Sequence, residues 1–106
     1  MSLKWPNKDP DEILDYSIDW SRFLSGATIS SVTWFVDDAD GVKTQLIPSG
    51  QLVKGIQLIS ATNTDKVATA RLGSGDNNIE YQFYCRIADT NGLVVERKVR
   101  LRVRNK

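Results

Sequence analysis

The residues best suited to bind a metal lie in one short loop, Asp37-Asp38-Ala39-Asp40-Gly41. Closely spaced carboxylates before a glycine suit a hard cation such as Ca²⁺. If Gly41 took the place of the invariant glycine of an EF-hand loop, however, the first and last ligand positions would fall on Val36 and Ile47. Neither side chain binds a cation, and Asp-Gly is also typical of a hairpin turn. The sequence therefore favours a solvated turn over weak, adventitious calcium binding, and we expect no metal site.

Catalytic chemistry is disfavoured as well. The chain has one cysteine, Cys85, and no histidine, which excludes an imidazole base and paired thiolates. Cys85 lies in the middle of a predicted strand on its apolar face, where burial raises the pKa of a thiol. Asp15 and Asp19 are spaced like a pair of catalytic carboxylates, but strand alternation puts both on a face open to solvent. We expect no enzyme activity, no catalytic residues and no cofactor.

We expect these residues to lie on or between β-strands, because apolar and polar residues alternate with period two in nearly every apolar segment. One helical turn is expected at residues 9–14, with Asp9 as N-cap and Pro10 at the first helical position. Asn91-Gly92 predicts a hairpin between the last two strands. The strands are expected at residues 14–20, 31–36, 42–47, 52–61, 66–72, 81–87 and 98–104.

This pattern predicts an all-β fold, an immunoglobulin-like antiparallel β-sandwich of about seven strands. With 106 residues the chain is long enough for one domain, which we place at residues 11–106, after an extended N-terminal arm at residues 1–10. Trp34 on the second strand and Cys85 on the penultimate strand echo the immunoglobulin pattern, although the partner cysteine is missing. Apolar runs are short, so we expect no membrane span and no signal peptide.

Charge is unevenly distributed although the net charge is +1. Residues 1–40 hold eight acidic and three basic residues, and residues 41–106 hold five acidic and eleven basic ones. Two oppositely charged faces would attract copies of the same chain head to tail. Alternatively, the two terminal segments lie side by side and neutralise each other.

A row of cations follows the last strand, at alternate positions. It has three interpretations: a solvated face that also protects a sheet edge, a surface for an acidic protein, or a strand that tracks nucleic-acid phosphates. The residues are Lys98, Arg100, Arg102 and Arg104.

Trp5 is the large side chain of the arm, where Pro6 and Pro10 disfavour a helix. Tryptophan is enriched among the residues that dominate binding at interfaces. Either Trp5 folds back on its own domain or a neighbouring protein holds it. In the second case, deletion of residues 1–8 should leave the melting temperature nearly unchanged and weaken assembly.

The opening stretch from Lys8 to Trp20, KDPDEILDYSIDW, resembles the opening of small tailed-bacteriophage virion proteins described as fibre-tail adaptors. The middle of the chain agrees at Leu24, Ile29, Ser31 and Trp34, and the end agrees from Tyr81 to Val103, including Glu96-Arg97 and Leu101-Arg102-Val103. Residues 41–66 agree least, and Ala27-Thr28 stands where the family has an acidic residue.

This resemblance implies a non-enzymatic structural protein of the virion, in the tail or neck region, that joins tail or neck proteins to fibres through protein–protein contacts. Its partners would be other virion proteins, in several copies around the tail axis, with no membrane and no nucleic acid. A chain without disulfides also suits synthesis in bacterial cytoplasm. The residues expected to bind partners are Trp5, Asp11, Glu12, Asp15, Asp19, Lys98, Arg100, Arg102 and Arg104.

Two other functions are compatible with the sequence. A small β-sandwich that binds carbohydrate or a host surface would expose clustered aromatic side chains, for which Trp20, Phe35 and Tyr84 are the candidates. A nucleic-acid binder would use the cationic last strand, and its affinity would fall steeply with salt.

Overall fold

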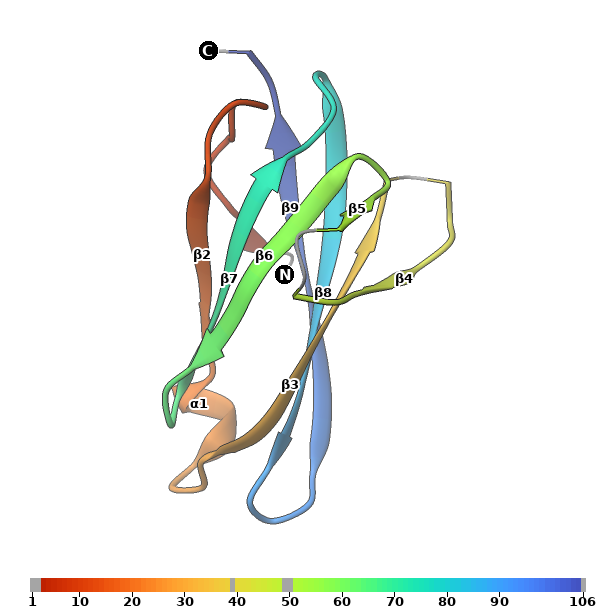
Figure 1. The fold of residues 1–106 in the computed structure, drawn as a ribbon. Coiled ribbons are helices and arrows are strands. Elements are labelled where there is room, and N and C mark those ends of the chain that lie inside the picture. Colours follow the sequence, from red (N-terminus) through yellow and green to blue (C-terminus); the bar gives the residue numbers. More distant parts are fainter. Residues whose placement is uncertain (1–2, 39, 49–50, 106) are drawn as a thin grey trace.

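The computed structural model describes residues 3–38, 40–48 and 51–105, and this part of the chain is almost entirely β-structure (Figure 1). The elements are β1 (Leu3–Lys4), β2 (Leu14–Asp19), α1 (Ser21–Leu24), β3 (Ile29–Asp37), β4 (Thr44–Leu46), β5 (Leu52–Val53), β6 (Ile56–Asn63), β7 (Val67–Ser74), β8 (Ile79–Asp89) and β9 (Val94–Val103).

Two sheets pack face to face, with strand orders β1-β9-β8-β3-β4 and β2-β7-β6-β5. All strand pairs are antiparallel except that of β1 with β9. The predicted all-β sandwich is therefore confirmed, and the described residues form nine strands rather than about seven. The more specific immunoglobulin-like assignment stays a prediction.

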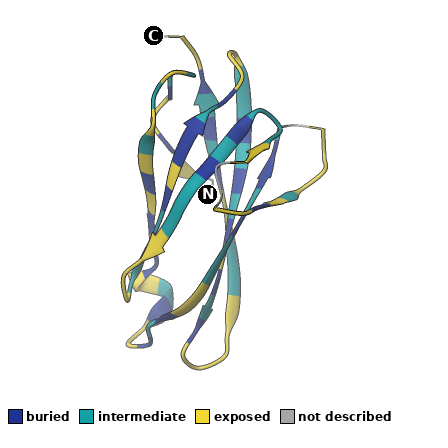
Figure 2. Cartoon of the chain, viewed as in Figure 1, coloured by how far each residue is buried: buried dark blue, intermediate teal, exposed yellow. Residues whose placement is uncertain are grey.

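The β8–β9 hairpin forms as its sequence dictates. Asp89 Oδ1 accepts hydrogen bonds of 2.9 Å from the backbone N–H groups of Asn91 and Leu93, and Gly92 adopts the positive φ of 84° that this turn requires. Buried and more exposed residues alternate along β8 and along β9 from Lys98 onward (Figure 2). The fully buried inward side chains are Tyr81, Phe83, Cys85, Ile87, Val99, Leu101 and Val103.

The centre of the core lies where β3 crosses this hairpin. Trp34 pairs directly with Cys85 in the register of β3 and β8, and both side chains are buried. On the facing sheet, β7 offers Ala68 and Ala70, both completely buried. Small side chains opposite large rings let the two layers approach closely.

Two local predictions differ from the structure, and one element was not predicted. The strand expected at residues 52–61 is two strands, β5 and β6, because Lys54 and Gly55 both take positive φ in a tight turn. The helical turn expected at residues 9–14 is a hydrogen-bonded turn from Asp9 to Glu12 instead. The short helix α1, whose four residues are too few for a periodic pattern, had no prediction.

The N-terminal segment docks on β9. The backbone N–H groups of Trp5 and Lys8 donate to the carbonyls of Arg100 and Arg102, at 2.9 and 3.0 Å. The Trp5 ring stacks on Tyr16, with ring centroids 4.8 Å apart, and its Nε1 donates to the Ser17 carbonyl at 3.2 Å. Of the two alternatives for Trp5, the structure therefore has the one in which it folds back on its own domain.

Replacement of Trp5 by alanine should lower the free energy of unfolding by about 3–5 kcal/mol, because a buried indole leaves a large cavity. Urea unfolding followed by circular dichroism measures this change. Asn7→Ala is the control, since Asn7 is exposed and surface changes cost less than about 0.5 kcal/mol. By the same reasoning, deletion of residues 1–8 should destabilise the fold rather than leave it unchanged. A Trp5→Ala variant with the wild-type unfolding midpoint would contradict this docking.

Candidate partner interfaces

The aspartates of the β3–β4 loop surround a lysine. Their ligand oxygens lie within 4.8 Å of one another, but Lys54 Nζ lies 2.7 Å from Asp40 Oδ2 and 3.8 Å from Asp38 Oδ1. The hydrogen bond from Lys54 lowers the pKa of Asp40 to about 2. The ammonium group thus supplies the positive charge that a cation would bring, and this cluster ties the β3–β4 loop to the β5–β6 turn.

Cys85 is enclosed in the core. Burial raises the pKa of its thiol to about 12. Arg97 covers the other side of this region, since its guanidinium carbon lies 5.2 Å from the centroid of the Trp20 ring. Cys85 therefore remains a protonated core side chain over the whole neutral pH range.

The shifted thiol has a consequence for stability at alkaline pH. The unfolded chain ionises Cys85 near pH 9.0, whereas the folded chain keeps it protonated up to about 12, so stability should fall as pH rises through this window. Chemical unfolding of wild type and Cys85→Ala across this range measures the difference. Cys85→Ala should have a lower free energy of unfolding than wild type at neutral pH. Its free energy of unfolding should fall less than that of wild type as the pH rises through this window. Equal alkaline losses in the two proteins would contradict the burial of the thiol.

The opening motif at Lys8–Glu12 acts inside the domain. Lys8 is completely buried, and its Nζ donates to the carbonyls of Asp9 at 2.9 Å and Ser74 at 2.6 Å. Asp9 Oδ1 accepts from the Asp11 N–H, and Glu12 Oε1 accepts from the Asp9 N–H, both at 2.8 Å. These reciprocal bonds fix the turn through which the chain passes from its N-terminal segment, beside β9, to β2.

The acidic residues expected to bind partners are only partly brought together. Asp15 and Asp19 share the outer face of β2, where Arg71 pairs with Asp15 at 2.8 Å and lowers its pKa through a side-chain hydrogen bond. Asp19 accepts from the Ser21 N–H at 2.9 Å, and this bond lowers the pKa of Asp19. Asp11 is exposed in the turn, while Glu12 is engaged with the backbone of Asp9. The acidic surface is therefore centred on β2.

The basic residues of the last strand do share a face. Lys98, Arg100 and Arg102 point outward from β9, opposite Tyr84, Gln82 and Glu80 of β8. We call these three residues, with Arg104 just beyond, the basic stripe. None of the four forms an ion pair with any residue that the structure describes.

The surroundings of the basic stripe bear on two of the alternatives drawn from the sequence. The two terminal segments do lie side by side, through the pairing of β1 with β9. The N-terminal segment places Lys4 beside Arg100 in the strand register, so it adds a cation rather than an acid. The acidic residues of β2 lie in the other sheet. From Val99 to Arg104, β9 is paired with residues 3–8, so this half is not a free edge that needs protection. The unpaired cations therefore form a charged surface on the flat of the sheet.

Sequence reasoning missed a cluster on the same outer face. Phe35 and Tyr84 are half-buried, and Lys43 Nζ lies 5.0 and 4.8 Å from their ring centroids. Arg86 lies over Phe35 at 4.7 Å, and both cations share Glu96, at 2.9 Å from Lys43 and 3.0 Å from Arg86. Alternation along β3 and β8 places the two rings outward, but the contributing residues of β3, β8, β9 and the β3–β4 loop are too far apart in sequence to reveal the cluster.

The aromatic residues do not form a surface for carbohydrate. Trp20 is completely buried, and the rings of Phe35 and Tyr84 are covered by Lys43 and Arg86. These positions count against a sugar-binding module, which needs open ring faces.

The chain is similar to one described protein family. A family profile named Gp77, described as podophage GP4 fiber-tail adaptor protein gp77, matches residues 8–102. Comparison with curated proteins gave no match. No helix in the described part of the chain has the length and apolar character needed to span a membrane.

Proposed function

The chain belongs to the podophage fiber-tail adaptor family, and we propose on this basis that it is a structural protein of the virion tail that joins fibres to the tail. It acts through protein–protein contacts rather than catalysis. It is made in the host cytoplasm, where a chain without disulfides folds readily, and is present in several copies around the tail axis.

The basic stripe is the observation that carries the proposed contacts. Arg71, Lys43 and Arg86 form ion pairs with carboxylates, whereas the four cations of the basic stripe form none in the described part of the chain. Glu80, opposite Arg102 in register, is the one carboxylate among the three β8 residues that face the stripe. Unpaired charge on a flat sheet face favours a neighbour of opposite charge, since complementary potentials steer and orient association. The partner surface for the basic stripe is therefore acidic.

The acidic surface centred on β2 lies on the opposite sheet from the basic stripe. Asp15, Asp19 and the exposed Asp11 of the preceding turn suit a basic neighbour, which is either a different tail protein or the next copy of this chain. With Trp5 buried in its own domain, these contacts do not depend on a free N-terminal arm.

Charge reversal in the basic stripe tests this function. Particles from a phage that lacks the chain should be supplied with wild type, with Arg100→Glu/Arg102→Glu or with the control Arg22→Glu, and scored for bound chain and bound fibres. Arg22 is exposed on α1, away from the basic stripe. The double variant should lose about tenfold or more of fibre attachment at a temperature where circular dichroism shows it folded, and the control should behave as wild type.

Full fibre attachment by the double variant would contradict the proposed contact. Fibres on particles that contain no chain at all would contradict the adaptor function itself. Tight binding of the wild-type chain to DNA that weakens steeply with salt would indicate a nucleic-acid partner instead.

A further inference from the structure

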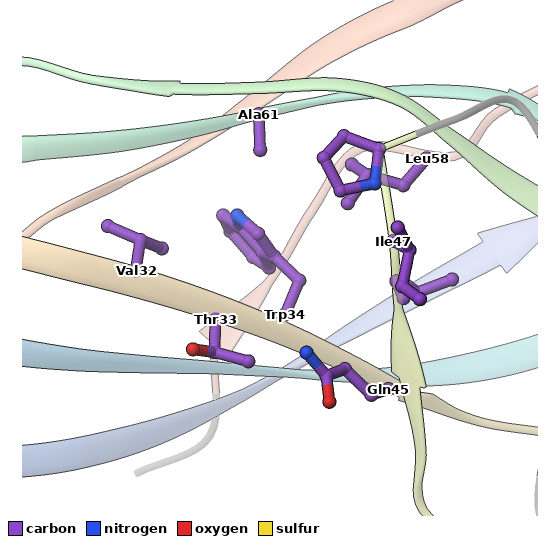
Figure 3. Close-up of a pocket in the computed structure, with 9 residues that line it drawn as sticks. Val32, Thr33, Trp34, Gln45, Ile47, Leu58 and Ala61 are labelled. Atoms are coloured by element: carbon purple, nitrogen blue, oxygen red, sulfur yellow. The ribbon is translucent and has the colours of Figure 1, made fainter.

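A groove opens between the two sheets on the side of the sandwich formed by β4 and β5. Its cavity of about 150 Å³ is lined mainly by apolar side chains of β3, β4 and β6, among them Val32, Trp34, Leu46, Leu58 and Ala61 (Figure 3). Ile47 and Pro48 also line the cavity, and Ile47 is largely exposed. Thr33 and Gln45 add polar groups to the lining, so the groove combines apolar side chains of the core with polar surface.

Both sheets have an open edge at this groove. β4 pairs only with residues 34–36 of β3, and β5 pairs only with residues 56–57 of β6. In the described part of the chain, residues 31–33 of β3 and 58–61 of β6 therefore have no neighbouring strand on this side. Segments 29–36 and 56–63 contain no charged residue, although charges and prolines are the usual protection of a sheet edge.

A buried hydrogen-bond donor lies in the wall of the groove. Trp34 is 2% exposed, and its Nε1 has no hydrogen-bond partner among the described residues. In Figure 3 the nitrogen of this indole lies on the side of the ring that faces Ala61 of β6, within the groove. An orphaned buried N–H is costly, so a bound carbonyl group at this point would satisfy it.

The charges beside the groove indicate the chemistry of its occupant. Arg86 of β8 pairs with Thr33 in register, and its guanidinium extends over Phe35, so its positive charge lies over the outer face of β3. Lys43 and Arg86 share the single carboxylate of Glu96, which leaves one positive charge in excess. Outward side chains of a strand added beside β3 would lie next to these cations.

We propose that this groove receives an extended segment of another tail protein, which adds as a strand to the free edge of β3. Inward side chains of the segment are apolar and fill the cavity beside Trp34 and Leu58. Its outward side chains include carboxylates that face Lys43 and Arg86, and a backbone carbonyl accepts from Trp34 Nε1. The proposal rests on the adaptor function and names a second contact, separate from the basic stripe.

Two matched variants test the groove in the complementation assay. Ala61→Arg places a long side chain at the groove, whereas Thr62→Arg places the same side chain one residue along β6 on the outer face, where Thr62 pairs with Thr69. Incorporation into particles should fall about tenfold or more for Ala61→Arg and stay at the wild-type level for Thr62→Arg. Trp34→Phe removes the orphaned donor and also part of the buried ring, so it should be less stable than wild type. Compared at a temperature where both proteins are folded, it should incorporate about tenfold less well.

Photo-crosslinking identifies the occupant. Gln45→p-benzoylphenylalanine places the probe beside the groove, and Ser17→p-benzoylphenylalanine places it on the far sheet as a control. In assembled particles the first should crosslink to an extended segment of a different tail protein, with apolar and acidic residues in alternation. A crosslink to a second copy of this chain, or to a segment of another pattern, would overturn the proposal.

Failure of the groove is distinguishable from failure of the adaptor function. If Ala61→Arg incorporates like wild type, the groove is not a docking site while the adaptor function stands. If the wild-type chain is absent from particles, both proposals are wrong.

Discussion

The docking of residues 3–8 along β9 determines what the rest of the molecule can do. Two backbone hydrogen bonds, from Trp5 to Arg100 and from Lys8 to Arg102, attach this segment as a parallel neighbour of β9. The Trp5 ring packs in the aromatic cluster of Tyr16, Trp34 and Phe83. The Lys8 ammonium donates hydrogen bonds to the backbone carbonyls of Asp9 and Ser74. The most distinctive residues of the opening motif thus stabilise the fold, and the partner contacts that we propose lie on the outer faces and the open side.

Because of this docking, one side of the sandwich is covered by the N-terminal segment and the other side is open. On one side the N-terminal segment covers β9, and the turn at Lys8–Glu12 leads across to β2. On the other side the short strands β4 and β5 leave uncharged edges and an apolar groove. A free domain gains nothing from an open edge, which invites aggregation, but a component of a larger assembly uses such an edge to pair with its neighbour.

Local patterns in the sequence predicted most of the strands but little of how they are joined. Alternation was sufficient for the β8–β9 hairpin, the inward direction of Trp34 and Cys85, and the outward direction of the basic stripe. It did not reveal that Trp5 is a core residue, because its place depends on pairing with Arg100, far along the chain. Nor did it separate β5 from β6, since Lys54 takes a positive φ that its residue type does not favour. The groove depends on how short β4 is, a tertiary property without a sequence pattern.

The central claim is that residues 3–8 belong to the folded domain before any partner binds. Amide hydrogen exchange of the isolated chain, followed by NMR, tests it most directly at the Trp5 and Lys8 N–H groups. The account predicts that both exchange as slowly as the central amides of β8, because they open only when the domain unfolds. Exchange at the rate of an unstructured peptide at these two positions would show a free arm and contradict the account.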